Sequence, residues 1–246
     1  MPESLAANSG APAWQIFAYI GEAVAAFAIG SIPFGVIIGR LFYRIDIRAS
    51  GSGNIGAANA LRTFGRVGAL SVLVLDALKG FVPVALVMTF GARWGAQAAA
   101  SVLLLAGIAG FAALLGHCYS PWLRFRGGKG VATHLGVLLA LSWPIGLLFI
   151  ATWAVAALSS GYSSAGSLLA TLVSAVGLWL ALGPIGLVYG AAAAIIIFWR
   201  HRDNLARLRT GSEHRMSLFA RGGSGIARSP ASPEKTFQAH RRTPPA

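Results

Sequence analysis

The sequence has few charged residues and a single cysteine. Only 11% of its 246 residues are Asp, Glu, Lys or Arg, whereas a soluble globular domain usually carries about 25%. Because Cys118 is the one cysteine, no disulfide can form within the chain. Residues 1–13 contain no Lys or Arg, and a secretory signal peptide opens with a positive region, so we expect no cleaved signal. The composition excludes a disulfide-stabilised secreted domain.

Long apolar runs take the place of the missing charge. Hydrophobic residues make up 56% of the chain and form continuous stretches such as 101–115, 131–141 and 185–199. A helix needs about 20 mostly apolar residues to cross a bilayer, and several segments reach that length. A transmembrane β-barrel would instead show segments of about 10 residues with alternating polarity. The predicted fold class is an all-α integral membrane protein.

The apolar runs divide into seven predicted transmembrane helices. Their ranges are 14–39, 68–90, 96–116, 128–142, 145–160, 165–183 and 185–200. We therefore expect a seven-helix domain over residues 14–218. An extracytoplasmic segment, 1–13, precedes it, and a basic tail, 219–246, follows it. The tail is rich in Arg, Ser and Pro, so we expect it to be disordered.

The distribution of positive charge predicts the orientation in the membrane. Eighteen of the 20 Lys and Arg residues fall on one side of the predicted helices, in the segments 40–67 and 117–130 and from Arg200 onward. Loops rich in Lys and Arg stay in the cytoplasm. We therefore expect the N-terminus outside, the C-terminus in the cytoplasm, and the glycine-rich segments on the cytoplasmic face.

The first polar segment, SGSGNIGAANALRTFG at 50–65, has the composition of an anion-binding loop. Its glycines expose successive backbone N–H groups, which favour an anion, especially where a helix begins. An arginine that follows is near enough to bind a phosphate or a carboxylate. No GK[ST] follows the glycines, so this is not a Walker A loop; a flexible loop without a ligand is the alternative. The candidates here are Ser52, Gly53, Asn54, Gly56 and Arg62.

The second polar segment, GHCYSPWLRFRGGKG at 116–130, ends in a lysine between glycines at the start of the next predicted helix. Lysine beside the amides of a helix N-terminus is again suited to phosphate. The alternative is a basic loop that contacts anionic lipid headgroups. That alternative accounts for Arg124 and Arg126 but not for the glycines. The candidates here are His117, Gly127, Gly128, Lys129 and Gly130.

Two pairs of polar residues extend the candidate set. His201 and Asn204, in RHRDNLARLRTG, are three residues apart and share a helix face, although an amphipathic helix on the membrane surface would show the same pattern. Asp76 and Lys79 share a face inside a predicted span. Ionisable residues are costly there, so this pair either binds a ligand or braces the fold.

Five motifs occur in a specific order over residues 27–218: GSIPFG, SGNIGAANALRTFG, DALKG, GHCYSPWLRFRGGKGVAT and RHRDNLARL. In order and spacing they resemble the bacterial acyl-phosphate:glycerol-3-phosphate acyltransferase family. The resemblance implies a seven-span enzyme of the inner membrane with its active site facing the cytoplasm. Such enzymes transfer a fatty acyl chain from acyl phosphate to the 1-position of glycerol 3-phosphate, which gives lysophosphatidic acid for phospholipid synthesis.

The resemblance assigns roles to the candidates. The catalytic residues that we expect are Ser52, Asn54, Lys129 and His201. The substrate-binding residues that we expect are Gly53, Gly56, Arg62, Asp76, Lys79, His117, Gly127, Gly128, Gly130, Ser164 and Asn204. Ser164 is matched to a serine of the family's YxS turn, and simple packing of serines between helices is the alternative. Two residues depart from the family pattern: Ala58 replaces a frequent threonine, and His134 a small residue.

The expected chemistry needs no covalent enzyme intermediate. Acyl phosphate is an activated mixed anhydride, so amides and cations that hold its phosphate, the oxyanion and glycerol 3-phosphate are sufficient. None of the five histidines is followed by Asp five residues later. The His-x4-Asp mechanism of other glycerolipid acyltransferases is therefore excluded, and the resemblance implies that a substrate phosphate oxygen accepts the proton.

We expect no cofactor and no metal, because Cys118 beside His117 lacks further ligands at metal spacing. The expected partners are the two substrates and membrane lipid, without nucleic acid, and the expected working unit is a monomer. A membrane transporter of phosphate esters is the alternative function. It would need a polar path across the bilayer, and the outer halves of the predicted spans offer few polar residues.

Overall fold

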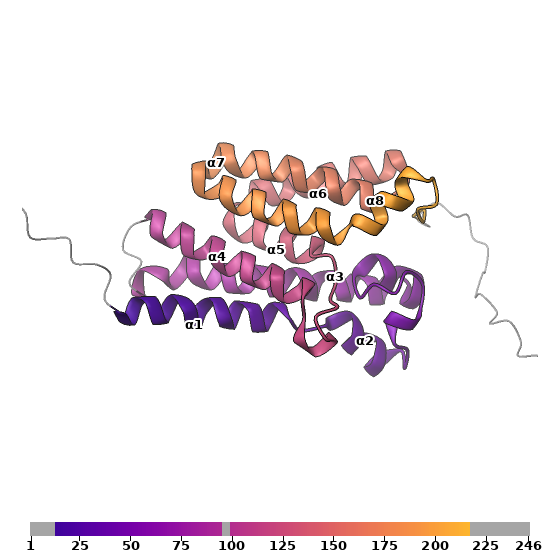
Figure 1. Cartoon of the computed structure of the whole chain (residues 1–246), viewed down its shortest axis with the longest axis horizontal. Helices are drawn as coiled ribbons and strands as arrows, with labels where there is room; N and C mark the ends of the chain where they lie inside the picture. Colours follow the sequence, from indigo (N-terminus) through magenta and orange to yellow (C-terminus); the bar gives the residue numbers. More distant parts are fainter. Residues whose placement is uncertain (1–12, 95–98, 217–246) are drawn as a thin grey trace, which may run out of the picture. The chain divides into compact units, whose positions relative to one another are not determined.

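The computed structural model describes residues 13–94 and 99–216, and every regular element in these ranges is helical (Figure 1). The longer helices are α1 (Ala13–Gly30), α3 (Ala57–Phe90), α4 (Ala99–Cys118), α6 (Trp143–Ser160) and α7 (Ser163–Arg200). The shorter ones are α2 (Phe34–Phe42), α5 (Val131–Leu141) and α8 (Arg202–Arg209), with 3-10 turns η1 (Ile47–Ala49), η2 (Gly91–Trp94) and η3 (Pro121–Leu123). Residues 1–12 of the expected N-terminal segment and the expected tail, 219–246, lie outside the described residues.

Within residues 13–94 and 99–216, five helical stretches are long and apolar enough to cross a membrane, which agrees with the predicted class. They are 16–42, 57–93, 99–123, 143–160 and 163–200. Helix α5 is also apolar, but its 11 residues are too few to span a bilayer on their own. Seven transmembrane helices were predicted, whereas the described residues form five stretches of spanning length and one short apolar helix.

The two numbers differ for two reasons: α5 is short, and 163–200 counts as one stretch although α7 is broken at Gly183. Gly183 has φ 62°, a left-handed value that glycine adopts without a steric penalty. The two arms of α7 then lie against each other, since a Cβ added at Gly190 would be 2.9 Å from Cα of Ala175. The single 38-residue helix is thus a pair of antiparallel arms, which correspond to the predicted ranges 165–183 and 185–200.

The first predicted span, 14–39, is also interrupted. It ends at Gly30, and residues 31–33 separate α1 from α2. Pro33 has no backbone N–H and restricts the residue before it, so it cannot continue the helix of α1. Lys79 Nζ donates a hydrogen bond to the Ile32 carbonyl at 2.9 Å, which satisfies one of the backbone groups at this break.

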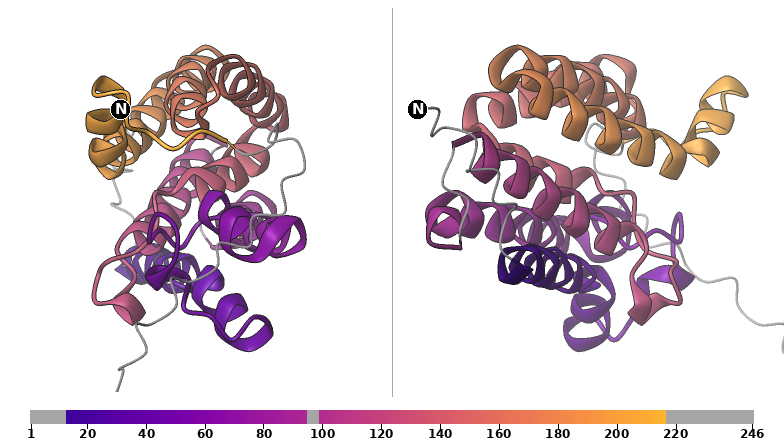
Figure 2. Two further views of the ribbon diagram at one scale, coloured as in Figure 1. Left: turned by 90° about the vertical axis from the view of Figure 1, so that its right-hand side faces the viewer. Right: turned by 60° about the vertical axis from the view of Figure 1, so that its left-hand side comes forward.

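Glycines allow the helices to approach closely. A Cβ at Gly136 of α5 would lie 1.9 Å from the Ala77 carbonyl oxygen of α3, and one at Gly30 of α1 would lie 2.2 Å from the Ala113 carbonyl oxygen of α4. Small residues at such contacts are typical of membrane helices, whose association depends on tight packing. As a result α4 and α5 lie between the α1–α3 pair and the α6–α7 pair (Figure 2).

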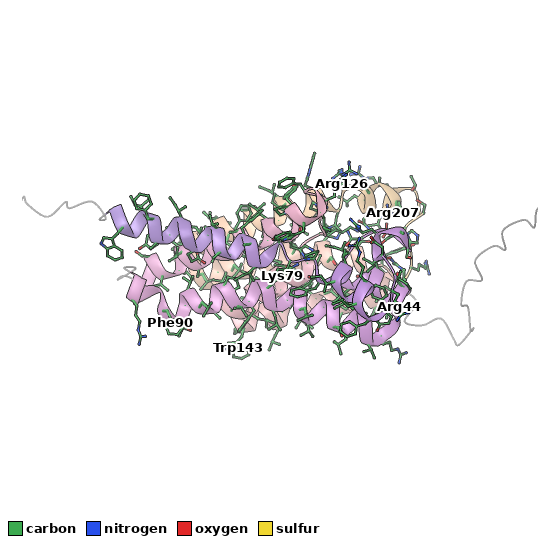
Figure 3. All side chains as sticks on the ribbon, turned by 90° about the horizontal axis from the view of Figure 1, so that it is seen from below. Arg44, Lys79, Phe90, Arg126, Trp143 and Arg207 are labelled. Carbon is green, nitrogen blue, oxygen red and sulfur yellow. The ribbon has the colours of Figure 1, made fainter. Side chains whose placement is uncertain are left out.

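The connections that carry the polar motifs lie at one end of the helices. Figure 1 shows α2, the turn around η3 and α8 at the same end. Figure 3 shows Arg44, Arg126 and Arg207 gathered there, with Phe90 and Trp143 toward the opposite end. Segments that are more than 100 residues apart in the sequence therefore meet at one end.

Candidate active site

The first polar loop, residues 50–56, packs on buried apolar side chains. Ile47 and Ile55 are buried in a cluster with residues of α2 and α3. Helix α2 approaches so closely that a Cβ at Gly35 would lie 1.9 Å from the Ile55 carbonyl oxygen. Gly51 and Gly53 have φ values of 57° and 69°, which make the sharp turns that other residues adopt rarely.

Asn59, in the first turn of α3, organises this loop from inside. Its Oδ1 accepts a hydrogen bond from the N–H of Ser52 at 2.9 Å. Its Nδ2 donates to the carbonyls of Ile47, Ser50 and Asn54 at 3.1, 3.0 and 2.8 Å. The side chain is 1% exposed, so it takes the place that water would take in a flexible loop. Asn59 was not among the residues predicted for the site; an amide in an otherwise apolar helix start was the available signal.

The loop ends at the N-terminus of α3, which begins at Ala57, whereas the predicted span begins at residue 68. Gly56 precedes the first helical residue, and its N–H donates to Oδ1 of Asn54 at 3.0 Å. The Asn54 side-chain NH2 and the N–H groups of residues 54, 55, 57 and 58 have no hydrogen-bond acceptor among the described residues. Ser52 is exposed. These donors, at the positive end of a helix dipole, form a surface that suits an anion.

The second loop, residues 124–130, packs against the end of α4. The N–H groups of Gly127 and Gly128 donate to the carbonyls of Cys118 and His117 at 3.1 and 3.0 Å. A Cβ at Gly127 would lie 2.0 Å from the His117 carbonyl oxygen, and one at Gly128 would lie 2.0 Å from His117 Nε2. Both positions therefore require glycine. Gly130, with φ 86°, turns the chain into α5.

Arg200, the last residue of α7, binds the second loop from the other side. Its Nε and Nη2 donate to the carbonyls of Gly128 and Gly127 at 2.9 and 2.7 Å. The guanidinium also lies over the Tyr119 ring, 5.5 Å from its centroid. Arg200 is a second residue that was not predicted for the site. In the sequence it was only one of the positive charges that indicate the orientation.

Lys129 faces the third motif. Its Nζ donates to Oδ1 of Asn204, and Nδ2 of Asn204 donates to Oε1 of Glu213 at 2.8 Å. The other oxygen of Glu213 accepts from Nε of Arg207 at 2.8 Å. The chain Lys129–Asn204–Glu213–Arg207 thus joins the second loop to α8 and to the segment after it. Lys129 and Asn204 were both candidates from the sequence, but neither their direct hydrogen bond nor the role of Glu213 was predicted.

Arg62, which follows the first loop, affects the pKa of Lys129. Burial lowers the pKa of Lys129 from 10.5 to about 8; Glu213 opposes this, and the positive charges of Arg207 and Arg62 add to it. Arg62 therefore lies close enough to Lys129 for the two charges to interact. Two cations that repel each other in a half-buried site are stabilised by an anion placed between them.

His201 lies at the joint between α7 and α8 and is 2% exposed. Its Nδ1 donates to the Ile197 carbonyl at 2.8 Å, because a carbonyl can only accept. Burial lowers the pKa of His201 to about 4, and the charge of Lys129 contributes to this shift. The ring is therefore neutral at physiological pH, with the lone pair on Nε2.

Asp76, Lys79 and His117 lie behind the two loops. Lys79 Nζ is 2.8 Å from Asp76 Oδ1, and His117 Nδ1 is 3.7 Å from the same oxygen. All three side chains are buried, and Lys79 also binds the carbonyl between α1 and α2. Of the two roles that the sequence left open for the Asp76–Lys79 pair, these contacts support bracing.

Ser164 lies in the first turn of α7, with its Oγ buried and without a hydrogen-bond partner among the described residues. The turn before it is bonded to the segment that follows the third motif. The Gly161 carbonyl accepts from the N–H of Met216 at 2.8 Å, and Arg215 lies over the Tyr162 ring. The structure thus connects this turn to the segment that carries Glu213.

The candidates therefore separate into two groups. The loop residues and the third motif meet at one end of the helices, as the sequence analysis expected. The buried group of Asp76, Lys79 and His117 supports them from within. In residues 13–94 and 99–216, no three His, Cys, Asp or Glu side chains are close enough to hold a metal ion.

His134, which departs from the expected pattern, lies apart from this site. Its two ring nitrogens are 2.9 Å from the Tyr189 hydroxyl and 3.3 Å from Ser174 Oγ. It joins α5 to both arms of α7 in the interior of the helices. The imidazole therefore acts in packing.

Known proteins are similar to this chain in sequence. A family model described as glycerol-3-phosphate acyltransferase matches residues 20–211. The glycerol-3-phosphate acyltransferase of Rhodopseudomonas palustris (strain BisB5) is 44% identical over 199 residues, which cover 80% of this chain and 96% of that one. The enzyme of the same description from Jannaschia sp. (strain CCS1) is 46% identical over 191 residues, 78% of this chain and 89% of the relative.

Solved structures agree. The crystal structure of PlsY (YgiH), an integral membrane glycerol 3-phosphate acyltransferase, in its glycerol 3-phosphate form matches with a TM-score of 0.73 and 36% identity, covering 80% of this chain and 95% of that one. Its lysophosphatidic acid form matches with a TM-score of 0.72 and 35% identity over the same shares. The chain therefore belongs to the glycerol-3-phosphate acyltransferase family and is a membrane acyltransferase.

Proposed function

We propose that this protein transfers a fatty acyl group from acyl phosphate to the 1-position of glycerol 3-phosphate, which gives lysophosphatidic acid and phosphate. The observation that carries the proposal is the convergence of Arg62, Lys129, His201 and Asn204 beside two loops with free amides. The similar crystal structure occurs in a glycerol 3-phosphate form and a lysophosphatidic acid form. These are the acceptor and the product of the proposed reaction.

Two anion-binding loops suit a reaction with two phosphates. Acyl phosphate and glycerol 3-phosphate each carry one, and the reaction needs them side by side. The first loop offers Ser52, Asn54 and backbone amides at the start of α3, and Arg62 follows it. The second offers Lys129 and the amides before α5. Donors fixed in advance stabilise the oxyanion that develops on the acyl carbon without reorganising during the reaction.

Direct transfer fits the acid–base state of the site. His201 is neutral at physiological pH, with Nδ1 donating to a backbone carbonyl, so only Nε2 is left to contact substrate. We assign it to orienting glycerol 3-phosphate, with Ser164 and Asn204. A phosphate oxygen of a substrate then accepts the proton of the attacking hydroxyl. The buried group of Asp76, Lys79 and His117 supports the loops from behind.

We further propose that the chain crosses the inner membrane seven times. The crossings are α1, α3, α4, α6, the two arms of α7, and the predicted span 128–142, in which α5 supplies 11 helical residues and the flanking residues complete a short crossing. The positive residues at the motif-bearing end support a cytoplasmic active site, with the N-terminus outside. A soluble acceptor then reaches the site from the cytoplasm while the acyl donor reaches it from the bilayer. We take the monomer, in contact with membrane lipid, as the working unit.

One assay tests the donor and the product together. The purified protein in detergent is given palmitoyl phosphate and labelled glycerol 3-phosphate, and labelled lysophosphatidate is measured. We expect product from palmitoyl phosphate and none from palmitoyl-CoA alone. Product from palmitoyl-CoA alone would contradict the proposed donor. Counterflow of labelled glycerol 3-phosphate in liposomes tests the transporter, and uptake without lysophosphatidate would favour that alternative.

A further inference from the structure

We propose that Arg200 is a positioning residue of the active site, whose guanidinium orients the backbone of the second loop so that its free amides face a substrate phosphate. This inference rests on the proposed function, because it assigns the second loop to a phosphate. Arg200 is the first residue of the motif RHRDNLARL, and the sequence assigned it no role in binding.

The contact is a two-pronged one. Nε and Nη2 of Arg200 donate to the carbonyls of Gly128 and Gly127, at 2.9 and 2.7 Å. A guanidinium presents its N–H groups in a fixed plane, so two bonds to successive carbonyls define the direction of both. The Tyr119 ring lies along the guanidinium, 5.5 Å from its centroid, and restricts where the group can move.

The direction of a carbonyl also sets the direction of an amide. In a trans peptide the C=O and the following N–H point to opposite sides. The peptide between Gly127 and Gly128 is held on both sides, by Arg200 and by the His117 carbonyl. The peptide between Gly128 and Lys129 is held by Arg200 on its carbonyl side. Its N–H points the other way and has no acceptor in the described part of the chain.

Two successive glycines make this restraint necessary. Glycine visits conformations that other residues avoid, so a peptide between glycines rotates easily. If the peptide between Gly128 and Lys129 turned over, its carbonyl oxygen would replace the free N–H and would repel the phosphate. The Cβ contacts described above exclude larger residues at both positions, so the loop cannot be stiffened by substitution. A bound side chain is the remaining means.

The same end of α7 controls the lysine between the glycines. Asn204, four residues after Arg200, accepts from Lys129 Nζ. Arg200 therefore orients the loop backbone while Asn204 orients the loop side chain, both from the α7–α8 joint that also presents His201. The loop amides, the Lys129 ammonium and the neutral His201 imidazole are therefore all held by the same joint.

The variants Arg200→Ala and Arg200→Lys separate positioning from charge. Lysine keeps the positive charge but cannot bind two carbonyls in one plane. Arg202→Ala is the matched control: it removes the same charge two residues away, from an exposed side chain that lies over Trp199 and 3.8 Å from Asp203. Arg200→Gln, which keeps one donor, replaces Arg200→Ala if that variant aggregates.

Steady-state kinetics on the full chain in detergent gives the main readout. We expect Arg200→Ala to raise the KM of at least one of the two phosphate substrates 10-fold or more, with kcat changed less than 3-fold. Arg200→Lys should fall between this variant and the wild type, and Arg202→Ala should stay within 2-fold of the wild type. Unchanged KM values in Arg200→Ala would overturn the proposal, and so would full activity in Arg200→Lys or a loss confined to kcat.

A binding measurement keeps this test separate from the proposed donor. Calorimetry with glycerol 3-phosphate and with inorganic phosphate needs no acyl transfer. If the wild type gives no product from acyl phosphate, the proposed reaction fails. Weaker binding of either probe by Arg200→Ala, with a retained melting temperature, still supports the role of Arg200. Equal binding of both probes overturns it.

Discussion

Oδ1 of Asn59 lies 2.9 Å from the backbone N of Ser52, and its Nδ2 reaches three carbonyls of the same loop. One buried amide thus satisfies the polar groups that a tight glycine loop leaves exposed. Buried polar groups need such partners, since each one left without a hydrogen bond is costly. The shape of the first anion-binding loop therefore depends on a side chain outside it.

Replacing Asn59 by Ala should lower kcat/KM by about 100-fold, because misplacing a binding group by about 1 Å has an effect of that size. Ser71→Ala is the control: it removes an exposed hydroxyl of α3 that bonds only to the Val67 carbonyl, and it should be neutral. Assays of both variants beside the wild type check this. Equal activity in Asn59→Ala would show that the loop keeps its shape without the amide.

Lys129→Ala should abolish acylation of glycerol 3-phosphate while the protein still elutes as a folded species in detergent. The ammonium belongs to the second loop itself and bonds to Asn204 of the third motif, and alanine offers neither charge nor donor. Arg209→Ala is the control, because it removes an exposed charge of α8. Full activity in Lys129→Ala would reject the assigned role.

The pH profile should reflect the titration of Lys129. Burial lowers its pKa to about 8, so the ammonium loses its proton as the pH rises through 8, and kcat/KM should fall in that range. Lys129→Arg keeps its charge at all relevant pH values and should move this alkaline limb upward, even if its activity is lower. An alkaline limb at the same pH in Lys129→Arg would assign the titration to another group.

Gly128→Ala should inactivate the protein, since the added Cβ would lie 2.0 Å from Nε2 of the buried His117. Neither group has room to move, so the loop must leave its place. Gly21→Ala in α1 is the control, because a Cβ there meets nothing within 4 Å. Glycine is a poor helix former, so Gly21→Ala should be neutral or slightly stabilising. Wild-type activity in Gly128→Ala would mean that the loop is not packed as described.

The Asp76–Lys79 pair should contribute to stability more than to substrate binding. Lys79→Met leaves a carboxylate and the Ile32 carbonyl without their partner, and breaking a buried pair costs about 3–5 kcal/mol. The double variant Asp76→Asn/Lys79→Met removes both charges and should be less destabilised than Lys79→Met alone. Denaturation in detergent measures both. Unchanged stability with lost activity would instead assign the pair to substrate binding.

The sequence alone determined the class of the protein and the content of its motifs. Apolar runs, scarce charge and a one-sided distribution of Lys and Arg follow from the cost of placing charge in a bilayer, which acts on each segment separately. The anion-binding composition of the two loops could also be predicted, because the glycines and cations of each loop lie within one short stretch of sequence. The break at Gly183 was predicted, because the ranges 165–183 and 185–200 meet there, whereas the break before Pro33 inside the predicted span 14–39 was not.

Only the tertiary structure decided what those motifs contact. Asn59 and Arg200 act through hydrogen bonds to backbone groups of other elements, and nothing in their own neighbourhood in the sequence names these partners. Arg200 reaches across 72 residues to Gly128. The division between residues that face the phosphates and the buried group around Asp76 also depends on which helices pack together. The hydrogen bonds of Asn59 and Arg200 form only when the helices pack together, because their partners belong to other elements.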